Sequence, residues 1–233
     1  MFDFVRKKDI WDACDKGYLN EIKSKKISYQ LKHAQDLAIY RIVRDSHDLQ
    51  IAEIGGGNSR ILERLAIKNR CANIEKFEGK NLGPHGEIKL NAVRNINCYI
   101  GDFDKVISDE QFDLLFSISV IEHVETHCLD EFFGDSLRIL KSGGGFYHAI
   151  DMYLQDSPTS YNLERFDIYK RWVADNDLVM PAGNVFSGGL EFSADMISNP
   201  DNILYGWNSL APSLSQIRAK AQNVSLIVGG IKK

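Results

Sequence analysis

Residues 51–60, IAEIGGGNSR, place three consecutive glycines between a short apolar run and a stretch with helical spacing. The apolar run is typical of a buried strand, and the apolar residues of SRILERLAIKN (59–69) recur on one face of a helix. Glycine lets the main chain turn sharply and approach a ligand, and the free N–H groups that open the next helix favour an anion. We therefore expect Gly55, Gly56 and Gly57 to contact a ligand, although a plain tight turn would use the same residue type.

The alternation of short apolar runs with helical stretches continues to residue 154. Strands are expected at 50–55, 71–78, 97–102, 112–121 and 146–153, and a helix stopped by glycines at 129–145. Such alternation indicates parallel strands joined by right-handed helical crossovers. Two later strands, at 190–197 and 224–233, leave no room for a further crossover and should form an antiparallel edge. The sequence thus predicts an α/β fold with a doubly wound, mostly parallel, seven-stranded sheet, an antiparallel edge strand and N-terminal helices.

The two ends of the chain differ from this regular middle part. Apolar residues at helical spacing before residue 46 predict an N-terminal helical cap over 1–46, ahead of a main domain over 47–233. After residue 154 the pattern loosens and prolines punctuate the loops. Because residues 154–190 have no place in a minimal sheet, we expect them to form a lid or substrate-binding insertion.

Composition narrows the classes of partner. The chain has 233 residues and a net charge of −4, which suits one substantial α/β domain and disfavours a dedicated nucleic-acid binder. Its four cysteines are isolated in the sequence, as expected for free thiols in a reducing compartment. No apolar run reaches transmembrane length, and the first residues lack the apolar core of a signal peptide. We expect a cytoplasmic protein that acts on a small molecule, with no nucleic-acid or membrane partner and with a homodimer as one possible assembly.

Four ordered stretches carry a resemblance to a known family. They are IAEIGGGNSRILERLA, NIEKFEG, CYIGDFDKVISDEQFDLLFSISVIEHV and LRILKSGGGFYHAID, spread over roughly residues 50–151. In this order and at this spacing they resemble the class I S-adenosylmethionine-dependent methyltransferases. The first stretch departs from the usual form, because Ser59 stands where a third glycine is common. The resemblance implies a Rossmann-like methyltransferase fold and S-adenosylmethionine as the cofactor.

The resemblance also implies which residues bind the amino-acid end and the ribose of that cofactor. The glycine turn would face the methionine end, with Glu53 beneath it and Ser59 opening the next helix. A carboxylate after the second strand would accept both ribose hydroxyls. Glu75 and Glu78 are the two candidates, and Glu75 is preferred because it directly follows the apolar strand residue Ile74.

Three further residues belong to the implied cofactor site. Asp102, expected to end the third strand, would accept a hydrogen bond from the adenine amino group, and Phe103 would flank the base. An aspartate at this point could equally be a helix N-cap. Ser119, in the turn after the central strand, would lie along the methionine and sulfonium end.

Methyl transfer requires an aligned acceptor and, for a hydroxyl, a group that removes its proton. His123 and Asp151 are the candidate catalytic residues, although a structural or adenosyl-facing role for His123 stays open. The expected reaction is O-methylation of a sugar or secondary metabolite by in-line displacement. His123 and His127 could share a helix face near Asp151, but no HExxH motif is present, and we expect no metal.

Two other functions remain as alternatives. A nicotinamide-dependent oxidoreductase on a similar sheet would need a third glycine where Arg60 stands. A non-catalytic methyltransferase-like subunit would be marked by a degraded first motif or a missing adenine-binding acid, and neither is seen.

Overall fold

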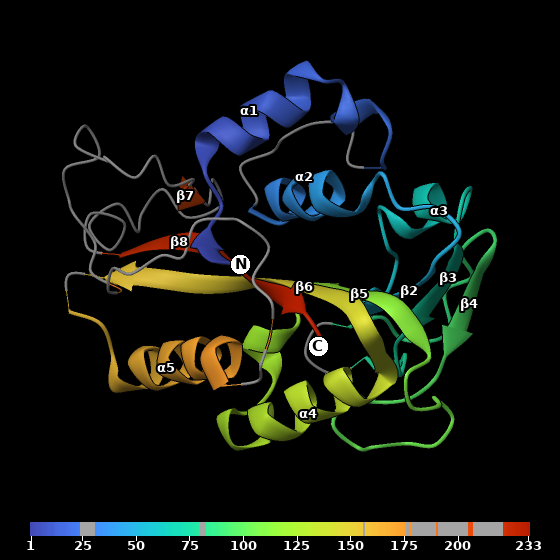
Figure 1. Ribbon diagram of the computed structural model, residues 1–233. Helices are drawn as coiled ribbons and strands as arrows, with labels where there is room; N and C mark the ends of the chain where they lie inside the picture. The colour runs from blue at the N-terminus through green and yellow to red at the C-terminus, as the bar shows by residue number, and fades with distance from the viewer. Residues whose placement is uncertain are drawn as a thin grey trace.

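The computed structural model describes residues 1–23, 31–79, 83–155, 157–175, 178, 190, 205–206 and 221–233. A central sheet separates two layers of helices (Figure 1). On one face lie α1 (Lys7–Asp15), α2 (Leu31–Val43) and α3 (Leu62–Leu65). On the other face lie α4 (Leu129–Ile139) and α5 (Ser160–Asp175). Helices on both faces of a sheet confirm the predicted α/β fold class.

Five strands form the parallel part of the sheet. They are β4 (Val93–Ile96), β3 (Arg70–Ile74), β2 (Gln50–Ile54), β5 (Phe112–Ile118) and β6 (Leu140–Gln155), in that spatial order. Every neighbouring pair among them is parallel. The chain therefore runs outward from β2 to β4 and then returns to β5 on the other side of β2. Ligands bind at such a reversal in doubly wound sheets, beyond the carboxyl ends of the strands.

The remaining strands make the other edge of the sheet antiparallel. β8 (Ala221–Ile231) pairs with β6 from Gly145↔Ile231 to Gln155↔Ala221, and short β7 (Tyr205–Gly206) pairs with β8. The outer side of β8 is covered by β1 (Phe2–Phe4), also antiparallel to it. The strand expected at 190–197 lies, apart from its first residue, outside the described residues.

β1 is an addition to the expected N-terminal helices. Phe2 and Phe4 are buried on either side of Asp3, and the ring centroid of Phe2 lies 5.2 Å from that of Phe166 in α5. A three-residue strand is too short for its alternation to register as a pattern, so it was missed. Beyond it, the expected helices are present as α1, the 3-10 helix η1 (Tyr18–Asn20) and α2.

Several predicted boundaries are wrong, each for a local reason. The helix expected at 59–69 is helical only over Leu62–Leu65. The strand expected at 97–102 is a loop, and the strand β4 lies at 93–96 instead. The prediction was wrong because half-exposed β4 carries fewer apolar residues than the loop that follows it. The glycines at 143–145 do not stop a helix but lie inside β6, which begins six residues before the expected strand and ends two residues after it.

Each face of the sheet has its own apolar core. One packs α4 and α5 against the sheet through residues such as Phe132, Phe133 and Tyr169. The other packs α1, α2 and α3 through residues such as Leu37 and Leu62. Within the described ranges, no helix is long and apolar enough to cross a membrane.

Candidate active site

The glycine turn follows β2 at the centre of the sheet. Gly55 and Gly57 have positive φ values of 66° and 48°, in the left-handed region that favours glycine. A Cβ on Gly55 would lie 2.6 Å from Val120 Cγ2, so the turn after β2 packs directly against the turn after β5. A Cβ on Gly56 would lie 2.6 Å from Asn73 Oδ1. Backbone conformation and close packing therefore both require glycine here.

Glu53 lies beneath this turn, as expected, with only 4% of its surface exposed. Ser59 Oγ donates a hydrogen bond to Glu53 Oε2 and accepts from the main-chain N–H groups of Ile61 and Leu62, at 3.2 and 3.0 Å. Burial raises the pKa of the Glu53 carboxyl to about 7, and the Ser59 hydrogen bond acts in the opposite direction. Ser59 thus joins the buried acid to the start of the helical turn that follows.

Two contacts that hold the glycine turn were not predicted. Asn73 Nδ2 in β3 donates to the Gly57 carbonyl oxygen at 2.9 Å. Arg60 forms a partly buried two-point ion pair with Asp36 of α2, with 2.7 Å between Nη2 and Oδ1. The only sequence signal for Asn73 is a polar side chain within an otherwise apolar strand. The Asp36 contact has no sequence signal, because its helix lies outside the motif.

The two acids after β3 are placed differently. Glu75 directly follows β3, and its Oε1 accepts from the N–H groups of Lys76 and Phe77 at 2.9 and 3.3 Å. The preceding residue, Ile74, accepts the Gly55 N–H at 2.8 Å, so Glu75 lies next to the glycine turn. Glu78 is exposed and accepts from Tyr99 Oη at 3.0 Å. The structure therefore brings Glu75, rather than Glu78, to the carboxyl end of the sheet.

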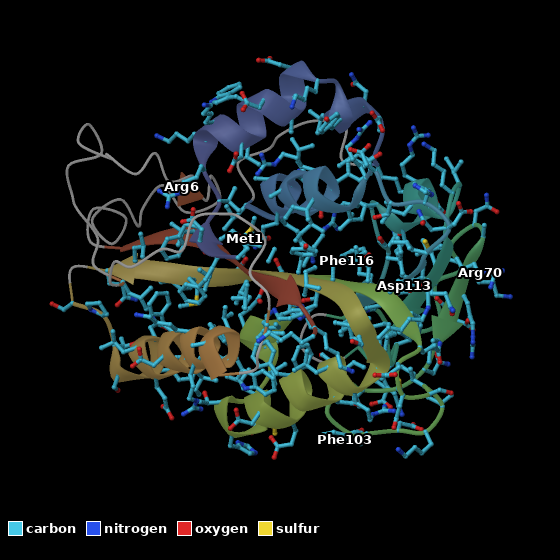
Figure 2. All side chains as sticks on the ribbon, in the orientation of Figure 1. Met1, Arg6, Arg70, Phe103, Asp113 and Phe116 are labelled. Atoms are coloured by element: carbon cyan, nitrogen blue, oxygen red, sulfur yellow. The ribbon has the colours of Figure 1, made fainter. Side chains whose placement is uncertain are left out.

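Asp102 and Phe103 lie on an exposed loop, and Asp102 does not end a strand as expected. The N–H groups of Gly101 and Phe103 both donate to Asp135 Oδ2 of α4, at 2.8 and 3.2 Å. Phe103 has φ 53°, and Figure 2 shows it on the outside of the molecule beside α4. Buried Asp135, which also pairs with Arg138 at 2.8 Å, fixes this turn and was not predicted.

Ser119 and Asp151 meet in one hydrogen-bond network. Ser119 follows β5 with φ 54°, and its Oγ donates to Gln35 Oε1 at 2.8 Å and to Asp151 Oδ1 at 3.3 Å. Gln35 of α2 in turn donates to Asp151 Oδ1 at 2.6 Å and to Ser225 Oγ at 3.1 Å. Asp151 lies inside β6, opposite Ser225. However, the pairing of β5 with β6 stops at Ala149, so Asp151 still lies beyond the end of the parallel sheet.

The 3-10 helix η3 (Ile121–His123) carries a second acid that sequence reasoning passed over. The two carboxyl oxygens of Glu122 are buried, and neither has a hydrogen bond of ordinary geometry within the described part of the chain. Burial, followed by the charge of Asp151, raises the pKa of Glu122 to about 8. Its neighbour His123 points outward, with 42% of its side chain exposed and Nε2 4.0 Å from Glu122 Oε1.

Arg165 of α5 holds this turn in place. Its guanidinium donates to the carbonyl oxygens of Ile121 and Val124 at 2.6 and 2.7 Å, and to Tyr169 Oη at 3.0 Å. Only 3% of Arg165 is exposed. Helix α5 is thereby joined to the turn that carries Glu122. No group of three or more His, Cys, Asp or Glu side chains suited to a metal ion is present among the described residues.

Comparison with known proteins agrees with this geometry. Residues 52–148 match the family model described as a methyltransferase domain. The match begins in β2, ends in β6 and includes the glycine turn, the Glu75 position and the η3 turn. No curated protein matches the sequence.

Two solved structures share the fold. One is phosphoethanolamine N-methyltransferase 2 from Haemonchus contortus in complex with S-adenosyl-L-methionine, at 14% identity and a TM-score of 0.58. The match covers 85% of this chain but only 52% of that one, so this chain spans about half the length of the Haemonchus enzyme. The other is geranyl diphosphate C-methyltransferase from Streptomyces coelicolor A3(2), at 14% identity and a TM-score of 0.52, with 87% of this chain and 80% of that one covered.

The family match and the sheet topology together define the middle part of the chain. Residues 52–148 match a methyltransferase domain, and the fold is that of the class I S-adenosylmethionine-dependent methyltransferases. S-adenosylmethionine is the cofactor of that class.

Proposed function

We propose that this protein transfers a methyl group from S-adenosylmethionine to a hydroxyl oxygen of a small organic acceptor, such as a sugar or a secondary metabolite. The observation that carries the proposal is the direct contact between the glycine turn after β2 and the Ser119–Val120 turn after β5. This contact brings the glycine turn beside a set of polar and acidic side chains, at the reversal point of the sheet.

In this proposal the main chain of Gly55, Gly56 and Gly57 binds the methionine end of the cofactor, with Glu53 and Ser59 ordering the turn from below. Glu75 accepts the two ribose hydroxyls, because a carboxylate at the end of β3 can accept both. Glu78 is the second choice, since it lies farther along the loop and already accepts from Tyr99.

The adenine is assigned to the loop after β4. Asp102 accepts from its amino group and the Phe103 ring flanks it; Asp135 holds the N–H groups on both sides of Asp102. Ser119 lies along the sulfonium end. When bound, the cofactor supplies an activated methyl carbon, so the protein has to align the acceptor and handle its proton.

The acceptor is assigned to the space bounded by Asp151 and His123, with α5 as part of the lid over 154–190. Asp151 is fixed by Gln35 and Ser119 and is suited to orient a hydroxyl group. The acidic character of this region favours a hydroxyl acceptor, because oxygen needs a proton-accepting group more than an amine does. We expect no nucleic-acid partner, and both the homodimer and the cytoplasmic location stay predictions.

Nicotinamide binding is the second candidate, and the structure gives a reason to disfavour it. The third glycine of that fingerprint permits close packing of helix against strand. Here Arg60 occupies the position of the third glycine, and its side chain forms an ion pair with Asp36.

Calorimetric titration with S-adenosylhomocysteine and with NAD tests the proposal. We expect S-adenosylhomocysteine to bind and NAD to give no heat. Gly57→Val should abolish binding, because it adds a side chain at positive φ next to Pro84. Gly17→Val is the matched control, since Gly17 also has positive φ (78°) but has open space around it, away from the site. Equal affinity of the wild type and the Gly57 variant would contradict the proposed site.

A further inference from the structure

The buried carboxyl of Glu122 is not explained by the packing of the fold. Both of its oxygens are enclosed, yet within the described part of the chain neither makes a hydrogen bond of ordinary geometry, although the main-chain N–H groups of Glu122 and Asp151 are close enough to lower its pKa. Buried polar atoms are nearly always hydrogen-bonded, so an exception calls for a reason such as a ligand. Glu122 lies two residues beyond Val120, whose side chain touches the glycine turn. The open hydrogen-bonding capacity is therefore close to the proposed methyl-transfer site.

The charged and titratable groups around Glu122 come from four elements. Asp151 of β6 and Lys32 of α2 act on it with opposite signs. Tyr169 of α5 interacts with it electrostatically, and His123 of η3 lies on its exposed side. Arg165 of α5 is directed at main-chain carbonyl oxygens on either side of it. Among the described residues the side chain paired with Glu122 is His123, whose Nε2 lies 4.0 Å from Oε1, and burial raises the pKa of the Glu122 carboxyl.

The two catalytic candidates named from the sequence are less suited to accept a proton. Asp151 Oδ1 already accepts hydrogen bonds from Gln35 and Ser119. His123 is largely on the solvent side of the turn. A general base works best when its pKa is close to the working pH, and a carboxyl that changes charge near neutrality meets that condition.

Resting on the proposed function, we propose that Glu122 is the group that takes the proton from the acceptor hydroxyl, with Asp151 and His123 on either side of it. The acceptor oxygen forms a bond to the methyl carbon as the carbon–sulfur bond breaks, and the electron pair of that bond stays on sulfur. The hydroxyl proton passes to the Glu122 carboxylate. His123, beside it and exposed, is placed to pass the proton on to solvent.

The first test is a titration that needs no acceptor. Carbon-13 NMR of protein labelled at the glutamate carboxyl carbons should show one signal that titrates near pH 8. This signal should be lost in Glu122→Gln, which separates it from that of Glu53, expected near 7. In Asp151→Asn it should titrate at lower pH, because a neighbouring negative charge is gone. The matched control is Glu125→Gln, in the same segment but with 77% of its side chain exposed, and it should leave the signal unchanged.

The second test measures methyl transfer from labelled S-adenosylmethionine to a panel of phenols and sugars. Glu122→Gln should lower kcat by about 100-fold or more, while affinity for S-adenosylhomocysteine stays within about threefold of wild type. For the wild type, kcat/KM should rise with pH, reach half of its plateau near pH 8 and level off above that pH, because the base must be unprotonated.

Either of two results overturns the inference: a Glu122 carboxyl that ionises below about pH 6, or a Glu122→Gln variant with kcat within threefold of wild type. If the wild type fails to bind S-adenosylhomocysteine, the proposed function fails instead, and the titration shows separately whether Glu122 is the unusual acid described here.

Discussion

The guanidinium of Arg165 donates a hydrogen bond of 2.6 Å to the carbonyl oxygen of Ile121, so helix α5 fixes the turn that carries Glu122. The same guanidinium reaches the Val124 carbonyl oxygen at 2.7 Å. A single buried side chain therefore links the segment proposed as a lid to the acids at the end of the sheet. A substituted Arg165 should change both stability and catalysis.

We expect Arg165→Met to reduce the free energy of unfolding by about 2–4 kcal/mol, because two buried carbonyl oxygens lose their charged donor. Urea unfolding measures this. Arg171→Met, in the same helix but largely exposed and paired with Asp130 only at 3.8 Å, is the control and should cost no more than about 0.5 kcal/mol. Equal losses for the two variants would show that the Arg165 contacts do not hold the turn.

Glu53 and Glu122 should each make the protein less stable as pH rises, whereas buried His148 and the N-terminal amine, whose pKa values burial lowers to about 3 and about 6, act in the opposite direction. The pKa values of Glu53 and Glu122 are about 7 and 8 in the folded chain, above the ordinary value of 4.5. Between pH 4.5 and its folded-state pKa, each of these carboxyls binds more protons in the folded state than in the unfolded state. Its contribution to the free energy of unfolding therefore decreases with increasing pH. The loss that these two carboxyls contribute should begin near pH 4.5 and end near pH 8.

Glu122→Gln isolates one part of that slope. The variant should match the wild type near pH 4.5 and be the more stable protein near pH 8, because an amide carries no charge to bury. Urea unfolding of both proteins across this range gives the comparison, with Glu125→Gln as the exposed control. Parallel curves for wild type and Glu122→Gln would mean that Glu122 ionises at an ordinary pH.

The ribose assignment can be tested on the two neighbouring acids. Glu75→Gln should weaken S-adenosylhomocysteine binding by about 10- to 100-fold, because hydrogen bonds to a charged acceptor contribute about 1.5–3 kcal/mol. Glu78→Gln should change the affinity by less than about threefold, since its side chain is exposed and directed at Tyr99. Calorimetry measures both. If Glu78→Gln weakened binding more than Glu75→Gln, Glu78 would be the residue that binds the ribose.

The central strands could be predicted from sequence because they are buried on both faces. β2, β3 and β5 start within one residue of the expected positions, and the glycine turn between β2 and α3 was expected from its composition. β4 was misplaced because Cys98 and Ile100 pack into the core from a loop, which gives that loop the composition of a strand. Apolar composition reports burial, whereas strand pairing depends on neighbours that a local pattern does not contain.

The candidate site was only partly predictable for a related reason. Glu53, Glu75, Ser119 and Asp151 follow or end apolar runs, so their place at one end of the sheet follows from parallel pairing. Gln35, Asp36 and Arg165 reach the site from helices outside the motifs, and their contacts join residues far apart in the sequence. Whether Glu122 or His123 is the proton acceptor depends on which of the two side chains is buried. The two residues are neighbours in a short turn, and the sequence of such a turn does not indicate which side chain points inward.

The most direct test of the whole account is a crystal structure of this protein grown with S-adenosylhomocysteine. We predict the methionyl group over the main chain of Gly55–Gly57, the ribose hydroxyls on Glu75 and the sulfur facing the turn that carries Ser119 and Glu122. A glycine turn left empty at saturating ligand, or one that holds a pyrophosphate in its place, would contradict the account.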